Sequence, residues 1–405
     1  MSPDLDGVDL LSDELWQRGF PHELFTELRR TAPVWWHPPT PEAERLAGGG
    51  FWVVSGHPEV QAANRNVEVF SSADGPSLAA RDDRQSGTPL VGQDPPEHTR
   101  FRKLLNRGFT PRMIGMLEEQ IAGWARRVVD AALDKGEVDF VAEVAYPLPM
   151  HMIADIVGIP AEDRLALFDK LMLVLAGFDP ASEVSNAERN ALEAEVFHYA
   201  HALGEQKRST PEDDVWTKLT SSGLSEFELD MFFMVLTLAG SETTRNTIAA
   251  GLLALIDNPD QLDLLRREPG RIPTAVDELV RWTSPVGYFR RTVTSDTELG
   301  GVAIAAGDRI TMWYPSANRD ERVFDEPFRF DVTRTPNPHV AFGGGGPHYC
   351  LGANLAKREI RVMFEQLLPR VAEFELLGQP TLSTPGIANP ISVSHNTVPL
   401  RLTPA

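Results

Sequence analysis

The sequence contains a single cysteine, Cys350, among its 405 residues. Without a second thiol the chain forms no intrachain disulfide, which excludes a disulfide scaffold and fits a reducing compartment. It also lacks any run of about 18 apolar residues, the length that a membrane-spanning helix needs, and its acidic N-terminus has no apolar signal core. Basic residues are few, with 38 Lys and Arg against 58 Asp and Glu and a formal net charge of −20. This balance argues against general binding to nucleic acids or anionic membranes, so we expect a soluble, cytoplasmic protein.

Helical patterns dominate the chain. Apolar residues recur every three or four positions between residues 113 and 132, which predicts an amphipathic helix. Further on, Ser225 and Glu228 form a capping-box motif that opens a helix extending to Asp257. The length of about 32 residues corresponds to about 48 Å, enough to cross a whole domain. We therefore expect the chain, residues 1–405, to form one domain.

Strand signals are sparse. Short runs of strand-like composition occur at Phe51–Val54, Thr292–Thr294, Thr297–Leu299, Val302–Ile304 and Arg309–Trp313. Glycines between the later runs are typical of tight turns, so these runs indicate a hairpin-like group. The fold class that we expect is mainly α with a small β portion, near the N-terminus and between Phe289 and Trp313.

Cys350 ends a glycine-rich segment, Phe342-Gly-Gly-Gly-Gly-Pro-His-Tyr-Cys, and a strongly helical run from Ala353 to Leu368 follows it. A helix N-terminus favours negative charge, so the thiol is placed to ionise and to bind a soft metal. The plainer alternative is a buried cysteine that acts as a small hydrophobe. Zinc is a poor fit because His348 is the only further ligand that the segment supplies. Iron in a haem is the leading candidate.

The segment resembles the haem-binding loop of the cytochromes P450, and other spaced motifs extend the resemblance from Phe51 to the C-terminus. It implies the P450 fold, with haem b (iron protoporphyrin IX) held by the thiolate of Cys350. The usual family loop places its phenylalanine seven residues before the cysteine, whereas Phe342 lies eight before Cys350. One residue is therefore inserted near Gly343 to Gly345. The longer loop is similar to that of actinobacterial members that oxidise methyl-branched lipids and sterol side chains.

The long helix contains Ala239-Gly-Ser-Glu-Thr-Thr244. A glycine inside a helix costs about 1 kcal/mol relative to alanine, so its presence needs a reason. It opens space for a small ligand, and an acid next to an alcohol inside a core can relay protons. By resemblance, Glu242 and Thr243 are the catalytic pair that delivers protons to dioxygen. The alternative is that both residues merely decorate the helix.

Glu278 and Arg281 are spaced i,i+3 on a helical pattern, which alone indicates no more than a surface ion pair. By position the pair resembles the Glu-x-x-Arg element of the P450 family. The resemblance implies that Arg329 completes a triad with them. Such a network of arginines and a carboxylate is structural, and it fixes the core around the cofactor.

Two further pairs of basic side chains resemble the haem-propionate ligands of the family. His98 and Arg102 are spaced i,i+4, so they can face one anion together. Arg291 and His348 occupy the other matching positions. A solvated surface position is the alternative for His98 or Arg102 taken alone.

The substrate pocket is the part that the sequence describes least. By helical spacing on the long helix, and by resemblance in the segment after Pro285, we expect the pocket to be lined by Val235, Leu238, Ala239, Val286 and Gly287. Core packing explains any one of these residues equally well. Together they predict an apolar cavity suited to a lipid, a terpenoid or a sterol.

A basic cluster stands out against the acidic whole: Arg100, Arg102, Lys103, Arg107, Arg112, Lys357 and Arg358. The alternative is ordinary solvated charge. By resemblance these residues lie on the face where an acidic ferredoxin docks, and opposite potentials would speed that encounter. The partners that we expect are a ferredoxin and a ferredoxin reductase.

The resemblance implies a haem-thiolate monooxygenase, which uses O2 and two electrons to put one oxygen atom into an unactivated C–H bond. A peroxide-driven haem enzyme typically replaces the acid–alcohol pair, which is intact in this chain. A non-catalytic haem carrier or sensor needs no such pair. A nucleotide-binding protein would need a Gly-Lys-Ser/Thr ending that the glycine loop lacks.

Overall fold

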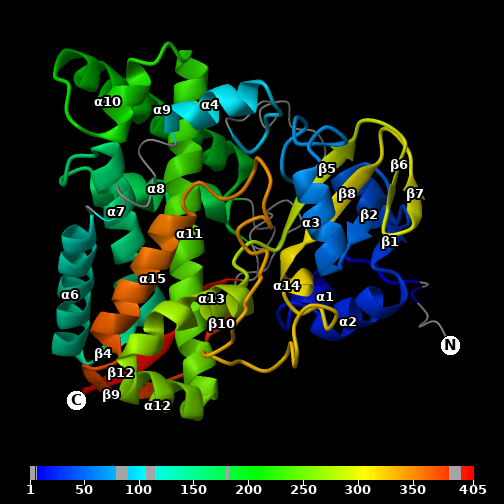
Figure 1. The fold of residues 1–405 in the computed structure, drawn as a ribbon. Coiled ribbons are helices and arrows are strands. Elements are labelled where there is room, and N and C mark those ends of the chain that lie inside the picture. Colours follow the sequence, from blue (N-terminus) through cyan, green and yellow to red (C-terminus); the bar gives the residue numbers. More distant parts are fainter. Residues whose placement is uncertain are drawn as a thin grey trace. The chain divides into compact units, whose positions relative to one another are not determined.

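The computed structural model describes residues 5, 7–78, 90–105, 115, 117–177, 182–382 and 394–405. The chain divides into two compact units, which Figure 1 shows as ribbons. The first unit comprises Met1–Arg100, Asp277–Cys350 and Ser383–Ser394, and the second comprises Phe101–Val276, Leu351–Leu382 and His395–Ala405. Two of the unit boundaries fall inside helices, one in α4 (Glu97–Leu105) and one in α13 (Ile272–Thr283).

The first unit is built on a five-stranded sheet. Its strand order is β1 (Val34–His37), β2 (Phe51–Val54), β8 (Arg309–Trp313), β5 (Tyr288–Val293) and β3 (Phe70–Ser71). Only the β2–β8 pair is parallel, and the other pairs are antiparallel. A separate hairpin joins β6 (Thr297–Leu299) to β7 (Val302–Ile304). This sheet and hairpin form the small β portion that the sequence predicts.

The predicted bounds of four of the five strands are confirmed. The remaining prediction, Thr292–Thr294, is wrong at both ends, because β5 begins at Tyr288 and ends at Val293. Tyr288 and Arg290 are buried and pair with β8, and this tertiary contact extends the strand into polar sequence.

Short helices accompany the sheet of the first unit: α1 (Asp13–Trp16), α2 (His22–Thr31), the π-helical turn η1 (Ala43–Ala47), α3 (His57–Arg65) and α14 (Tyr314–Ala317). Aromatic rings fill one of the cores. The indole of Trp16 stacks on that of Trp313, with ring centroids 5.5 Å apart and 15° between the planes. Phe25 packs against Trp313 as well. This packing holds the first helices to the end of β8.

The second unit is mostly helical. Its helical elements are α6 (Glu118–Lys135), η2 (Val141–Ala145), α7 (Pro147–Val157), α8 (Arg164–Ala176), α9 (Asn186–Ser209), α10 (Val215–Thr220), α11 (Glu226–Asp257), α12 (Pro259–Arg267), η3 (Pro269–Arg271) and α15 (Ala353–Leu367). A three-stranded sheet has the order β4 (Glu137–Asp139), β12 (Pro399–Pro404) and β9 (Val371–Leu376). β10 (Thr381–Leu382) pairs with β11 (His395–Thr397).

The helix α11 is the central element of the second unit. It packs against α7, α9 and α15, which surround it within this unit (Figure 1). The predicted capping box is present: the Glu228 amide donates to Ser225 Oγ (3.2 Å), and the Ser225 amide donates to Glu228 Oε2 (2.9 Å). The helix ends at Asp257, as predicted, before a proline that cannot continue it. The capping box and the proline therefore fix both ends of α11.

Candidate functional site

The cysteine loop belongs to the first unit. Gly343, Gly344, Gly345 and Gly346 all have positive φ, at 98°, 62°, 103° and 81°. A Cβ on Gly346 would lie 2.5 Å from the Asn64 carbonyl oxygen of α3, so a larger residue does not fit there. The Cys350 amide donates to the Phe342 carbonyl (2.9 Å), which closes the loop and leaves the cysteine exposed at its end. The four glycines thus accommodate the extra residue, and the main chain of Phe342 stays beside Cys350.

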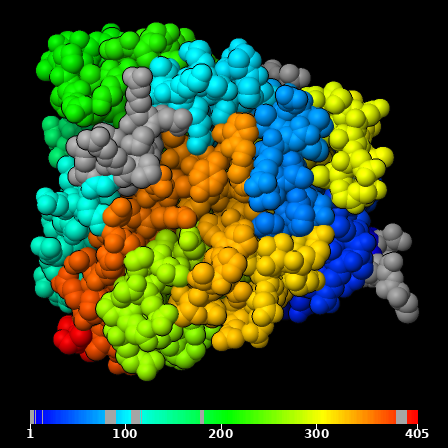
Figure 2. All heavy atoms as spheres, viewed as in Figure 1, coloured from blue at the N-terminus to red at the C-terminus, as the bar shows by residue number. Residues whose placement is uncertain are grey.

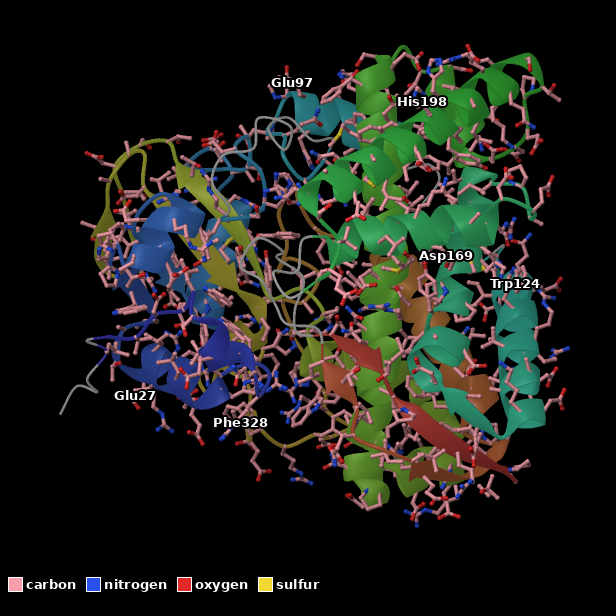
Figure 3. All side chains as sticks on the ribbon, turned by 180° about the vertical axis from the view of Figure 1, so that it is seen from behind. Glu27, Glu97, Trp124, Asp169, His198 and Phe328 are labelled. Atoms are coloured by element: carbon pink, nitrogen blue, oxygen red, sulfur yellow. The ribbon has the colours of Figure 1, made fainter. Side chains whose placement is uncertain are left out.

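Two predicted propionate ligands, His98 and His348, lie together in the first unit. Their ring centroids are 4.3 Å apart. Ser72 Oγ lies 3.1 Å from His348 Nε2. Asp94 fixes this group, because its side chain accepts from the Ser72 amide (2.8 Å) and its carbonyl accepts from the His98 amide (2.9 Å). His98 is 2% exposed, whereas Glu97, the first residue of α4, points outward (Figure 3).

Arg291, on β5, is a cation inside the first unit. It is 3% exposed, and Nη1 donates to the Arg290 carbonyl (2.7 Å). Among the described residues, its Nε has no hydrogen-bond partner. Burial lowers the pKa of Arg291, and the nearby Tyr314 and Asp94 offset only part of that effect. A buried guanidinium with spare donors is suited to an anion such as a carboxylate. Arg102 lies on the part of α4 that belongs to the second unit, and its predicted role stays a prediction.

The Glu278–Arg281 pair is buried in the first unit, and both side chains are 0% exposed. Arg281 donates from Nε and Nη2 to the two carboxylate oxygens, at 2.7 Å each. The side chain that completes the network is Arg334, whose Nε lies 3.3 Å from Glu278 Oε2. The prediction of Arg329 for this position is wrong. Its side chain is 58% exposed and pairs with Glu326 (2.8 Å), and only its carbonyl oxygen accepts from Arg281.

An apolar stripe on α11 stays uncovered in the middle of an otherwise buried helix. Ala239 is exposed, and Val235 and Leu238 are partly exposed, while their neighbours Leu236 and Thr237 are buried. The next turn brings Thr243 onto the same side of the helix, because it follows Ala239 by four residues. Thr243 Oγ1 donates to the Ala239 carbonyl (2.8 Å). The catalytic threonine that we predict thus adjoins three of the predicted pocket residues.

Gly240 has a packing role that the sequence did not indicate. A Cβ at this position would lie 2.4 Å from Ile153 Cδ1 of α7. The glycine therefore lets α7 approach α11 closely, in addition to any space that it opens for a ligand. The other predicted pocket residues, Val286 and Gly287, belong to the first unit, and their role stays a prediction.

Glu242 is 1% exposed and lies on α11. Its Oε1 accepts from the guanidinium of Arg245 and from Asn246 Nδ2 (3.2 Å). Burial raises the pKa of Glu242, and the charge of Arg245 opposes that effect. Glu242 is therefore an acid whose proton affinity depends on where Arg245 lies. Arg245 was not among the predicted site residues, although Glu242-x-x-Arg245 repeats the spacing of Glu278-x-x-Arg281.

A second buried acid, Glu359 on α15, was also missed. It is 1% exposed, and burial raises its pKa to about 8, an effect that the Thr244 hydroxyl of α11 offsets only in part. One sequence signal could have found it. Leu355, Glu359 and Met363 recur every four residues on the buried face of the helix, where a glutamate is unexpected.

Part of the basic cluster lies in described residues of the second unit. Arg358 pairs with Glu118 of α6, so its charge is compensated. α15 shows one face on the surface of the molecule (Figure 2). Arg107 and Arg112 lie outside the described residues, and the role of the cluster stays a prediction.

The residues present fit a haem held by a thiolate. The glycine loop presents one exposed sulfur, a soft ligand for iron. Arg291 supplies a buried cation with a spare donor for an acidic substituent. On α11, the uncovered stripe supplies an apolar surface next to a threonine. A mainly helical fold whose units carry these features is the one expected of a haem-thiolate protein.

Comparisons with known proteins identify the family. Residues 205–402 match the family model described as Cytochrome P450. A steroid C26-monooxygenase from Rhodococcus jostii is 39% identical over 95% of this chain and 83% of its own. A methyl-branched lipid omega-hydroxylase from Mycobacterium tuberculosis is 39% identical over 89% of this chain and 87% of its own.

A solved structure agrees with these relatives. The cytochrome P450 CYP268A2 of Mycobacterium marinum, in complex with pseudoionone, superposes with a TM-score of 0.90 at 36% identity and covers 98% of both chains. This chain therefore belongs to the cytochrome P450 family, has the P450 fold and is a monooxygenase. In the part of the chain that the structure describes, none of the helices has the length and apolarity that a membrane span requires.

Proposed function

We propose that this protein hydroxylates an apolar substrate, a sterol or a methyl-branched lipid, with O2 and two electrons from a ferredoxin and its reductase in the cytoplasm. The uncovered stripe Val235, Leu238 and Ala239 carries the proposal, because it offers apolar contact to the substrate directly beside the proton-relaying threonine. The named activities of the relatives, a steroid C26-monooxygenase and a methyl-branched lipid omega-hydroxylase, support this substrate class.

In this proposal the chain acts as one P450 domain of residues 1–405 that holds haem b through Cys350. The bound haem supplies the redox chemistry that splits O2 and inserts one oxygen atom into a C–H bond. The haem propionates are bound by Arg291, His348, His98 and Arg102. The buried charge of Arg291 supports that role, since a carboxylate would satisfy its free Nε.

The proton relay uses α11. Glu242 takes a proton from water and passes it to the Thr243 hydroxyl. The hydroxyl in turn gives its own proton to dioxygen. The Thr243 hydroxyl now donates to the Ala239 carbonyl, so its lone pairs are free to accept a proton. By the resemblance, Val286 and Gly287 are further pocket residues, and an apolar lining would exclude stray water.

Substrate binding and product analysis test the proposal. A sterol with its full side chain is titrated into the ferric protein, and the same sterol nucleus without the side chain serves as the control. A methyl-branched fatty acid is compared with its straight-chain counterpart. We expect the Soret band to shift on binding of a compound with a branched end, and oxygen to be inserted near that end. If no such compound shifts the band while small aromatic compounds bind tightly, the assigned substrate class is wrong.

Thr243→Ala tests the monooxygenase role of the relay. We expect NADH consumption to continue while product falls about 10²-fold and peroxide accumulates, because general acid catalysis is typically worth 10²–10⁴-fold. Product yield and peroxide are measured per electron pair consumed. Thr247→Ala is the matched control, since Thr247 makes the same bond to a carbonyl one turn later on α11. Unchanged coupling in Thr243→Ala would contradict the relay.

A further inference from the structure

A cavity of about 490 Å³ opens in the second unit, between the first half of α6, the end of α7 and the start of α10. Its volume lies in the range of about 300–1,000 Å³ that is typical of small-molecule sites. Leu117, Ile156 and Val215 give it an apolar wall, and its polar wall includes Trp124 and Arg127. None of its lining residues is among those assigned to the haem, the proton relay or the substrate, so the cavity has no part in the proposed function.

The indole of Trp124 is fixed at the cavity wall. The ring, which comes from α6 (Figure 3), stacks on that of His151 with centroids 3.6 Å apart and 7° between the planes. Its Nε1 donates to Asp155 Oδ2 (3.1 Å), and Arg164 binds the other oxygen of Asp155 (2.7 Å). Stacking and hydrogen bonding therefore hold the indole in one orientation.

Arg127 is a cation that the fold leaves without a counter-charge. Its guanidinium carbon lies 3.9 Å from the ring centroid of Trp124, three residues earlier on α6, which is a close cation–π contact. The side chain is exposed, and it forms no ion pair with any residue that the structure describes. Because the fixed indole already holds the guanidinium in place, an anion that binds it has little side-chain ordering to overcome.

The acids of the cavity wall carry their own cations, with one exception. Asp155 pairs with Arg164, Asp213 with Lys218 and Asp214 with Lys207, each at 2.7 Å. The exception is Glu119, which is exposed in the first turn of α6. The helix dipole and the solvent both weaken the field of a carboxylate at that position. The guanidinium of Arg127 is therefore the charge in this cavity that is best placed to recruit a ligand.

Gly123 leaves open the space beside this guanidinium. It lies inside α6, where a glycine is unfavourable relative to alanine. Among the described residues, a Cβ at this position would meet only Arg127 Nη1, at an ordinary contact distance of 3.7 Å. Packing therefore does not require a glycine here, in contrast to Gly240. The consequence of the missing side chain is room in the cavity next to Arg127.

We infer that this cavity binds a small amphipathic organic acid, with its carboxylate on Arg127 and its apolar body on Leu117 and Val215. The planar guanidinium offers paired N–H donors that match the two oxygens of a carboxylate. Glu119 disfavours a second negative charge on the ligand, so a monocarboxylate fits better than a dianion such as phosphate. This second ligand site does not depend on which substrate the haem pocket takes.

Calorimetric titration of decanoate into the ferric holoprotein tests the site. Excess 4-phenylimidazole, which binds haem iron and fills the space above it, keeps decanoate out of the haem pocket. We expect Arg127→Gln to weaken decanoate binding at least about tenfold, because a charge-assisted pair is lost. Arg126→Gln is the matched control, since this neighbouring exposed arginine does not line the cavity. Equal binding by Arg127→Gln and the wild type, or no binding by the wild type, would overturn the inference.

The charge of the ligand is tested with two analogues and one further variant. Decanol and decylamine, which lack the carboxylate, should each bind at least about tenfold more weakly than decanoate. Glu119→Gln removes the like charge, so decanoate should bind about twofold to threefold more tightly. Tighter binding of decylamine than of decanoate, or weaker decanoate binding by Glu119→Gln, would show that the site has the opposite preference.

Gly123 locates the ligand without any change of charge. Gly123→Leu fills the space beside Arg127, so decanoate should bind at least about tenfold more weakly. Gly123→Ala adds a single methyl group and should bind decanoate within about threefold of the wild type. Alanine and leucine both favour a helix over glycine, so both variants should fold, and thermal unfolding of each checks this. Equal decanoate binding by the two variants would contradict the assignment of the ligand to this cavity.

Discussion

The Glu278–Arg281 pair of α13 and the Glu242–Arg245 pair of α11 share the same i,i+3 spacing and differ in their surroundings. Both oxygens of Glu278 bind Arg281, and the Asp331 amide (2.9 Å) and Asn337 Nδ2 (3.0 Å) add two further donors. Glu242 has one oxygen without a partner among the described residues. Its arginine reaches toward solvent, whereas Arg281 is 0% exposed.

Under the proposed function, this difference separates a structural pair, Glu278–Arg281, from a pair that contains a proton-relaying acid, Glu242–Arg245. A fully satisfied buried ion pair has one arrangement, and any change leaves a buried charge without a partner. A half-satisfied pair at the edge of the interior leaves its acid able to take up a proton instead. Spacing along the helix is the same in both pairs, so only the three-dimensional neighbours distinguish their roles.

The largest expected effect is that of Arg281→Ala. The change leaves Glu278 buried with its main charge partner removed, so we expect a loss of about 3–5 kcal/mol in the free energy of unfolding. Urea denaturation followed by circular dichroism measures it. The counterpart, Arg245→Met, should cost about 1–2 kcal/mol, because Glu242 can take up a proton instead. Equal losses of unfolding free energy in the two variants would contradict the claim that the two pairs differ.

Glu359 extends the comparison to a buried acid without an arginine. Its pKa is about 8 in the folded protein and near 4.5 in the unfolded chain, so the folded state retains the proton between these values. The stability of the wild type therefore falls as the pH rises from about 4.5 to 8, by at most about 1.4 kcal/mol per pH unit.

Glu359→Gln should remove this slope, because the amide does not ionise. Chemical denaturation at pH 5, 6, 7 and 8 measures the free energy of unfolding of both proteins. Glu373→Gln, at an exposed position on β9, is the control for a general charge effect. A slope that persists in Glu359→Gln would show that another group titrates.

The smallest expected effects concern the arginines around the structural pair Glu278–Arg281. Arg334 binds Glu278 and donates from Nη1 to the Asp325 carbonyl (2.7 Å), so Arg334→Ala should cost about 1–3 kcal/mol. Arg329 pairs with exposed Glu326, so Arg329→Ala should change stability by at most about 0.5 kcal/mol. Thermal unfolding compares the two variants. The reverse order would restore the prediction of Arg329 from the sequence.

Local signals predicted the elements that carry their own start and stop residues. The capping box at Ser225 and the proline after Asn258 gave both ends of α11. The glycines between strands gave the β6–β7 hairpin with its correct bounds. In each case the residues that set the structure are neighbours along the chain.

The sequence failed where the partner lies far along the chain. The resemblance implied Arg329, yet the long irregular segment that follows α14 brings Arg334 rather than Arg329 to Glu278. Glu359 and Thr244 meet only because α15 packs on α11. The i,i+3 spacing of Arg245 from Glu242 is visible in the sequence. The burial of Glu242, which distinguishes this pair from a surface ion pair, is visible only in the structure.

Ligation of iron by one sulfur is the claim on which the account depends, and the carbonyl spectrum of the reduced protein tests it most directly. In the wild type we predict the red-shifted Soret band that a thiolate ligand gives. Cys350→Ala should lose this band, and Cys350→His should give the spectrum of a histidine-ligated haem. A carbonyl spectrum that is unaltered in Cys350→Ala would contradict the account.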